Sequence, residues 1–279
     1  MVSLRGFVLG GRRRKRMITS YANKTVKEVI SLIQKAKIRR QEGLFVAEGV
    51  KMFREAPVQK IRKVFVSQRA EKDLLQRCGD KLRQTGYEVV ADAVFDKMSD
   101  TKTPQGILTV IEQLQYDWKE FLKERPLLLL VEDIQDPGNL GTMFRAGEAA
   151  GVSGIILSKD TVDIYNPKTI RSTMGSVYRV PFIYTDDLGE VIRSLRQKQI
   201  AVYAAHLEGE KYYDEYVYEG GCAFLIGNEG NGLKEETAKL ADSYLKIPME
   251  GKVESLNAAV AASVLLYEAY RQRRKMITI

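Results

Sequence analysis

Apolar residues recur with two different periods along the first part of the chain. Residues 26–38 and 73–84 repeat apolar positions every three to four residues, which predicts amphipathic helices. Residues 62–67, 87–90 and 107–111 are short runs rich in valine, isoleucine and tyrosine, which predict strands. The first part of the chain is therefore expected to be a small α/β unit.

From residue 126 onward the strand-like runs become continuously apolar. The run at 127–131, Leu-Leu-Leu-Leu-Val, is typical of a strand covered on both faces. We expect strands at 127–131, 154–157, 178–184, 200–205, 223–226 and 244–247, alternating with helices at 139–151, 167–175, 187–198, 234–241 and 256–271. This alternation predicts a mostly parallel sheet.

The change at residue 126 divides the chain into two domains, which suits its length of 279 residues. We expect a basic leader at 1–16, a first domain at 17–113, a linker at 114–125 and a second domain at 126–279. The charges of the leader follow its apolar stretch, so it does not resemble a secretory signal. It is either an arm that touches phosphates or a disordered extension with Met17 as the true start.

Charge is distributed unevenly between these parts. The net charge is +8, yet residues 1–124 carry 26 Lys and Arg against 15 Asp and Glu, whereas residues 125–279 carry 18 against 21. A basic first half indicates a polyanionic partner such as RNA. The alternative is a surface whose charge only confers solubility.

The rare residues exclude several classes of site. Cys78 and Cys222 lie far apart, which excludes a disulfide framework and a cysteine zinc site and indicates a reducing, cytoplasmic compartment. His206 is the single histidine, so a histidine-rich metal site is not expected, and any Ser-His-Asp triad would have to use it. No apolar stretch approaches the roughly 20 residues of a membrane helix.

Candidate chemistry lies in three connections that follow predicted strands, where ligands of parallel sheets bind. In the first, Pro137 and Gly138 predict a tight turn and Asn139 a helix N-cap. Arg145 follows within that helix and could meet an anion. The alternative is a surface arginine that pairs with Glu148, and spacing alone leaves both open.

The second connection is glycine-rich and holds Gly227, Asn228, Glu229, Gly230 and Gly232. Its glycines allow a ligand to approach the backbone closely. Their spacing and late position do not fit a dinucleotide fingerprint, and no P-loop is present. The alternative is an ordinary turn between a strand and a helix.

The third connection ends at a helix that Ser255 or Asn257 can cap. That helix, which begins near residue 256, carries small or apolar residues all round and is expected to be buried on nearly every side. It packs either into the sheet or against a second subunit.

Together the three connections resemble the SpoU (TrmH) family of RNA ribose 2′-O-methyltransferases, in the SPOUT class, over residues 126–273. Segments 37–40, 45–49 and 101–106 resemble that family's substrate-binding domain, which looks like the L30e/L7Ae fold. The resemblance implies an α/β protein with a trefoil-knotted, mostly parallel sheet, preceded by a smaller L30e/L7Ae-like α/β domain. It also implies a homodimer in which the motif arginine reaches the reacting centre of the neighbouring subunit.

The resemblance further implies a role for each motif residue. The catalytic residues it implies are Asn139, Arg145, Glu229, Ser255 and Asn257. The residues it implies for S-adenosylmethionine (AdoMet) are Leu225, Gly227, Asn228, Gly230, Ile247, Met249, Leu256 and Asn257. RNA is expected at Lys37, Arg39, Arg40 and Lys102, and no metal is required.

The chemistry expected is methyl transfer to a ribose 2′-hydroxyl, with ribosomal RNA favoured by the separate basic domain. Arg145 would be a fixed positive charge beside the developing alkoxide, because guanidinium stays protonated. Asn139 would hold Arg145 or a phosphate, and Glu229 would orient Arg145 or accept a proton. The alternatives are a tRNA methyltransferase, a non-catalytic RNA-binding or ribosome-assembly protein, and a nucleotide-dependent oxidoreductase, which the late glycine-rich loop disfavours.

Overall fold

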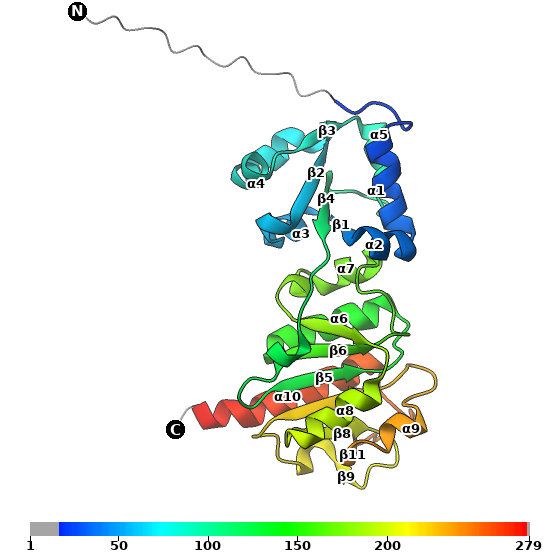
Figure 1. The fold of residues 1–279 in the computed structure, drawn as a ribbon, viewed down its shortest axis with the longest axis vertical. Coiled ribbons are helices and arrows are strands. Elements are labelled where there is room, and N and C mark those ends of the chain that lie inside the picture. Colours follow the sequence, from blue (N-terminus) through cyan, green and yellow to red (C-terminus); the bar gives the residue numbers. More distant parts are fainter. Residues whose placement is uncertain (1–16, 278–279) are drawn as a thin grey trace, which may run out of the picture.

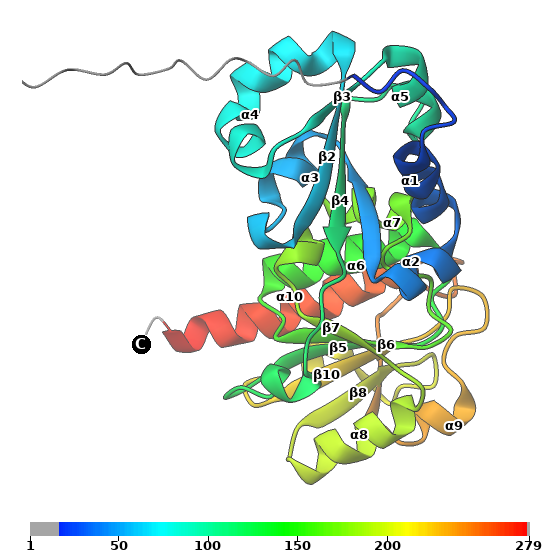
Figure 2. The same ribbon diagram turned by 45° about the horizontal axis from the view of Figure 1, so that its top comes forward.

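The computed structural model describes residues 17–277, which form two α/β units joined end to end (Figure 1). The expected leader at 1–16 lies outside the described residues. Among those described, no helix has the length and apolar content needed to cross a membrane. Figure 2 shows the same arrangement from a second side, with the N-terminal unit above the larger sheet and its helices.

The N-terminal unit is a four-stranded sheet with helices around it. Its elements are α1 (Lys24–Gln34), α2 (Ala36–Glu42), β1 (Leu44–Glu48), α3 (Val50–Glu55), β2 (Ile61–Ser67), α4 (Glu71–Thr85), β3 (Glu88–Val90), α5 (Asp92–Met98) and β4 (Ile107–Glu112). The strand order is β1-β4-β2-β3, with β4 antiparallel to both neighbours and β3 parallel to β2.

The single helix expected at 26–38 is wrong, because α1 and α2 meet at an extended residue, Lys35 (φ −123°, ψ 108°). Neither glycine nor proline marks this break, so the apolar period runs through it undetected. The short elements β1, α3 and α5 were not predicted, since runs of so few residues show little period.

The C-terminal unit confirms the predicted parallel sheet. Its elements are β5 (Leu127–Val131), α6 (Pro137–Ala150), β6 (Gly154–Ser158), α7 (Pro167–Thr173), β7 (Phe182–Thr185), α8 (Leu188–Gln197), β8 (Ala201–Ala205), β9 (Lys211–Tyr212), β10 (Cys222–Ile226), α9 (Glu235–Ala238), β11 (Ser243–Lys246) and α10 (Ala258–Ile277). The strands run parallel in the order β7-β6-β5-β10-β8-β11-β9. The knot implied by the resemblance stays a prediction.

Helices cover both faces of this sheet, which explains the continuous apolar run in β5. Leu127, Leu129 and Val131 pack with residues of α6, α7 and α10, whereas Leu128 and Leu130 pack with α8 on the opposite face. Alternate side chains of one strand therefore enter two separate cores. The layer of α6, α7 and α10 lies between the N-terminal unit and the larger sheet (Figure 2).

The two units share one of these cores. Phe45, Met52 and Ile111 of the N-terminal unit belong to the same buried apolar cluster as α6 and α10. The Phe45 ring lies 4.7 Å from the ring of Tyr165, which precedes α7. The units are therefore packed against each other rather than tethered by the linker alone.

Helix α10 is less buried than expected. Val260 and Tyr267 are 47% and 48% exposed, although Ala262, Leu265 and Leu266 on the opposite face are fully buried. The expectation of burial on nearly every side is wrong for the single chain, because only the face toward the sheet meets a partner there.

Candidate active site

A pocket lies where β8, β10 and β11 end side by side at the carboxyl edge of the sheet. It has a volume of about 560 Å³ and is lined by residues 205–207 after β8, 226–233 after β10, and Leu245, Lys246, Ile247, Met249, Glu254, Ser255, Leu256, Asn257, Ala258 and Ala261. Parallel sheets bind their ligands at this edge. The second and third predicted connections therefore meet in one cavity.

The glycine-rich connection is folded tightly around Asn228. The backbone N–H groups of Asn228 and Gly232 each donate to the other residue's carbonyl at 3.0 Å. The Asn228 side chain accepts from the N–H groups of Gly230 and Asn231 at 2.8 and 3.1 Å, and donates to the Asp133 carbonyl at 2.7 Å. A Cβ at Gly227 would lie 2.3 Å from the carbonyl carbon of Gly232. Only glycine fits at position 227 without moving the loop.

Three side chains link all three connections in one hydrogen-bonded chain. The Asn139 amide nitrogen donates to Glu229 Oε1 at 2.8 Å, and Asn139 Oδ1 accepts from the Asn257 amide at 2.9 Å. Glu229 also accepts from the backbone N–H groups of Gln135 and Asp136, both at 3.2 Å. Residues 90 and 118 positions from Asn139 along the chain are thus held together at the pocket.

Hydrogen bonds from its neighbours favour the ionised form of the Glu229 carboxylate. Burial acts to raise the pKa of Glu229, but the hydrogen bonds from Asn139 and from the backbone of Gln135 and Asp136 outweigh it and lower the pKa below its ordinary value. A carboxylate with a lowered pKa and three donors is a weak proton acceptor. The two expected roles for Glu229 were to orient Arg145 or to accept a proton. Among the described residues, its carboxylate instead holds Asn139 and the backbone of Gln135 and Asp136 in place.

Asn139 does not cap α6, contrary to expectation. Asp136 is the N-cap, because its carboxylate accepts from the Asn139 N–H at 2.9 Å and Pro137 occupies the first turn. The hydrogen bond from the Asn139 backbone lowers the pKa of Asp136. The Asn139 side chain is thereby free to join Glu229 and Asn257. It bonds neither to Arg145 nor to any other cation in the described part of the chain.

Of the two predicted caps for α10, Asn257 and not Ser255 caps the helix. Its Oδ1 accepts from the N–H groups of Ala259 and Val260 at 2.9 and 3.3 Å. Asn257 therefore fixes the helix start and touches Asn139 at the same time. Ser255 lines the pocket without a hydrogen bond to any residue between 17 and 277.

Arg145 is not brought into this pocket by its own chain. It is exposed and makes no hydrogen bond or ion pair with the described residues. It lines a second hollow of about 680 Å³ with Thr142, Met174, Lys51 of α3 and other residues near the junction of the two units. The expected alternative, a pair with Glu148, is absent because Glu148 binds Arg179 instead, at 3.0 Å for one of the two contacts.

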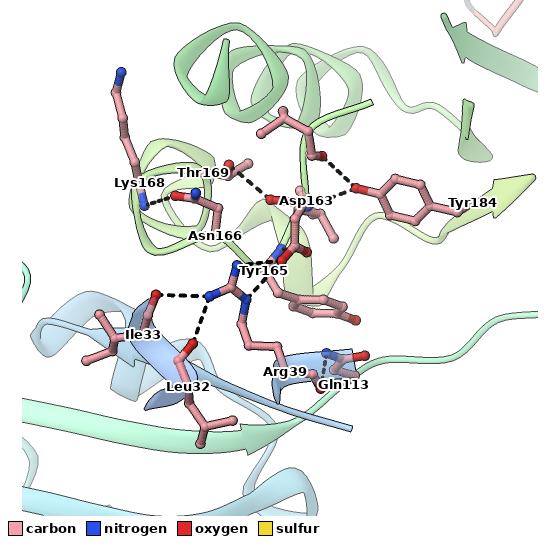
Figure 3. Close-up of polar contacts among 12 residues, drawn as sticks. Leu32, Ile33, Arg39, Gln113, Asp163, Tyr165, Asn166, Lys168, Thr169 and Tyr184 are labelled. Carbon is pink, nitrogen blue, oxygen red and sulfur yellow. Dashed lines mark hydrogen bonds and ion pairs between the residues drawn. The ribbon is translucent and has the colours of Figure 1, made fainter. Parts of the chain in front are cut away.

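Two of the expected binding residues point elsewhere. Leu225 is fully buried in the core on the α8 side, so its side chain does not line the pocket. Arg39 is 3% exposed, and its guanidinium binds Asp163 of the C-terminal unit (Figure 3). The expectation that Arg39 contacts RNA is corrected, because the side chain is enclosed between the units. Lys37, Arg40 and Lys102 are exposed.

The sequence did not single out the residues after β8 as part of a site. Ala205, His206 and Leu207 line the pocket because β8 lies directly beside β10 in the sheet. The order of the strands in the sheet would have identified these residues, but the apolar periodicity of the sequence does not give the strand order. No group of three His, Cys, Asp or Glu residues in the described chain is arranged to hold a metal ion.

Comparison with known proteins agrees with this architecture. Residues 126–267 match the SpoU rRNA methylase family, and residues 23–109 match the MRM3-like substrate-binding domain. The chain is 32% identical over 257 residues to the 23S rRNA (guanosine(2553)-2′-O)-methyltransferase RlmP of Bacillus subtilis, covering 90% of this chain and 98% of that protein.

Solved structures resemble the whole two-unit arrangement. An AdoMet-bound rRNA methyltransferase from Sinorhizobium meliloti is 31% identical with a TM-score of 0.80, covering 92% of this chain and 97% of that one. The SpoU methyltransferase AviRb from Streptomyces viridochromogenes, in complex with AdoMet, is 27% identical with a TM-score of 0.82, covering 90% of this chain and 98% of that one. With its family match, its pocket and its substrate-binding unit all in place, this chain belongs to the SpoU methylase family.

Proposed function

We propose that this protein transfers a methyl group from AdoMet to a ribose 2′-hydroxyl of ribosomal RNA. The observation that carries the proposal is the chain of hydrogen bonds from Glu229 through Asn139 to Asn257, which locks three separate connections around one pocket. Relatives named as 23S rRNA 2′-O-methyltransferases support the RNA class and the position of methylation. We also propose that the protein acts in the cytoplasm, where an rRNA substrate would be available to it.

The pocket fits AdoMet in size and lining. Its volume of about 560 Å³ lies within the range of small-molecule sites. Gly227 lines the pocket and, because it has no side chain, lets the Gly232 backbone pack against it, while Ile247 and Leu256 supply apolar surface. When bound, AdoMet supplies an electrophilic methyl group on a positively charged sulfur.

The acceptor hydroxyl gains negative charge as it attacks, and we propose that Arg145, supplied by a partner subunit, stabilises that charge. Its guanidinium has no partner within its own described chain, so it is available to an anion. It cannot act as a base, because guanidinium stays protonated in proteins. Glu229 and Asn139 hold the pocket in shape, which positions donor and acceptor for reaction.

We further propose that the protein acts as a homodimer in which α6 and α10 are buried. Val260, Val264 and Tyr267 form an apolar stripe on α10 that no described residue covers fully, and Arg145 stands exposed on the neighbouring α6. Exposed apolar patches of this kind mark protein interfaces. A second copy on this face would bring Arg145 close to the partner subunit's pocket.

Tyr267→Asp is expected to convert the dimer into a monomer, because it buries a charge in the apolar interface. Sedimentation equilibrium measures the mass directly. The matched control is Tyr21→Asp on the N-terminal unit, since Tyr21 is 49% exposed against 48% for Tyr267. If the Tyr267→Asp protein remained dimeric, Tyr267 of α10 would not belong to the dimer interface.

RNA is expected to bind the outer face of α2. Lys37 and Arg40 are exposed and make no ion pair with the described residues. The double variant Lys37→Ala/Arg40→Ala is expected to weaken RNA binding and to reduce the slope of log affinity against log salt by about two, one for each lost phosphate contact. Lys198→Ala/Lys239→Ala on the C-terminal unit is the control. An unchanged slope in the Lys37→Ala/Arg40→Ala protein would show that this face of α2 does not bind RNA phosphates.

The substrate is found by comparing RNA from cells with and without the gene. We expect one 2′-O-methylated nucleotide of ribosomal RNA to be missing without it. A mark lost from transfer RNA would redirect the proposal to tRNA. An identical pattern of marks in both would favour a non-catalytic RNA-binding protein.

A further inference from the structure

Arg39 joins the two units through a buried ion pair. It lies on α2 of the N-terminal unit, and its Nε and Nη2 atoms donate to one carboxylate oxygen of Asp163, in the loop before α7, at 2.9 and 2.7 Å (Figure 3). The Arg39 side chain is only 4% exposed and that of Asp163 25%. A guanidinium so enclosed is stable only when its charge and its N–H groups are matched.

Each partner of this pair is held rigidly by its own unit. Arg39 Nη1 donates to the carbonyls of Leu32 and Ile33 at the end of α1, at 2.8 and 2.9 Å. The second oxygen of Asp163 accepts from the backbone N–H of Tyr165 at 2.9 Å. Each side chain of the pair is hydrogen-bonded to the backbone of its own unit. The ion pair therefore links the backbone of one unit to the backbone of the other.

The start of the linker is fastened at the same place. The Gln113 amide donates to the Arg39 carbonyl at 2.9 Å. The Tyr165 hydroxyl accepts from the Leu114 N–H at 2.7 Å and donates to the Leu114 carbonyl at 3.1 Å. We call Arg39, Asp163, Tyr165, Gln113 and Leu114 the junction cluster.

The other contacts between the units are less specific in direction. The apolar contact of Phe45 with Tyr165 belongs to a core whose attraction is non-directional. The ion pairs Arg171–Asp100 and Arg179–Glu55 also cross the junction, but their side chains are 27–44% exposed, and exposed pairs contribute little. The forked bonds of Arg39 are thus the contact best suited to fix one orientation.

We propose that Arg39 is a positioning residue, which through Asp163 holds the RNA-binding face of α2 in one orientation relative to the methyl-transfer site. The proposal rests on the proposed function and deepens it. Lys37 and Arg40 are exposed on the same helix whose Arg39 is buried in the junction, so the ion pair would fix the position of RNA bound to this helix. A misplacement of about 1 Å can cost about 100-fold in rate.

The test is the double variant Arg39→Met/Asp163→Leu, which removes both charges and leaves none stranded in the core. Its melting temperature reports whether it folds. We expect kcat on RNA to fall about 10- to 100-fold, with the Kd values for RNA and AdoMet within about threefold of wild type. Trypsin is expected to cut the linker at Lys119 and Lys123 faster than in wild type, because the junction cluster is loosened.

The matched control is Arg171→Met/Asp100→Asn, which removes an exposed ion pair from the same junction and is expected to change kcat by less than about threefold. Arg39→Lys should recover part of the lost rate, because it restores a charge beside Asp163 without the fork. The proposal would be overturned if the Arg39→Met/Asp163→Leu protein had the kcat of wild type and its linker were cleaved at the wild-type rate. A fall in RNA affinity that accounts for the whole loss would also overturn it, since Arg39 would then act in binding. If wild type itself methylates no RNA, the proposed function fails, while the cleavage rates still decide whether the ion pair fixes the junction.

Discussion

Arg145→Ala is expected to lower methylation of RNA about 1000-fold while the Kd for AdoMet stays within about tenfold of wild type. The reason is that Arg145 and the pocket are separate within one chain. Arg145 lines the hollow near α3, whereas other residues line the pocket at the ends of β8, β10 and β11. A side chain outside the cofactor pocket can stabilise the transition state without contributing to cofactor binding. Single-turnover kinetics and calorimetry on the same protein give the two quantities.

The control for Arg145 is its neighbour Arg179, which lines the same hollow but is already paired with Glu148 and Glu55. Arg179→Ala is expected to lower the rate far less, because a paired guanidinium is not available to the substrate. Full activity in Arg145→Ala, with AdoMet affinity intact, would refute the catalytic assignment.

Gly227→Ala is expected to weaken AdoMet binding about 100-fold, which corresponds to about 2.7 kcal/mol. The added Cβ would lie 2.3 Å from the carbonyl carbon of Gly232, so the backbone of the loop must move. That movement opens the turn that Asn228 closes and displaces Glu229, which links the pocket to α6. Isothermal titration calorimetry measures the effect, and RNA affinity in the absence of AdoMet should stay unchanged.

Gly220→Ala is the control for Gly227→Ala, because a Cβ at Gly220 meets nothing within 4 Å. It is expected to bind AdoMet as wild type does. Wild-type AdoMet affinity in Gly227→Ala would show that the glycine-rich loop does not form the cofactor pocket.

The convergence of three connections at the pocket follows from features visible in the sequence. Apolar runs such as 127–131 and the alternation with helices indicate a parallel sheet, whose carboxyl edge collects the connections. The prediction that Asn139 caps α6 is wrong, because aspartate and asparagine both favour the N-cap and the preference of proline for the first helical turn decides between them. Pro137 points to Asp136 as the cap and leaves Asn139 free for the pocket.

Other features depend on contacts between distant residues, which local patterns do not contain. Arg39 and Arg40 are adjacent and equally basic, yet one is buried because Asp163 lies opposite it, 124 positions away. His206 reaches the pocket only because β8 pairs with β10. The exposed stripe of α10 resembles core in the sequence, because valine and tyrosine also occur in protein interiors and local composition does not show which face of a helix is covered.

Incubation of the purified protein with isotopically labelled AdoMet and ribosomal RNA from cells that lack the gene would reveal whether the protein methylates a ribose of that RNA. After digestion to nucleosides, mass spectrometry shows where the label has gone. We predict that it resides in one 2′-O-methylated nucleoside and depends on Arg145. Label on a nucleobase, or no incorporation by a protein that binds both AdoMet and the RNA, would show that the protein is not a ribose 2′-O-methyltransferase of this RNA.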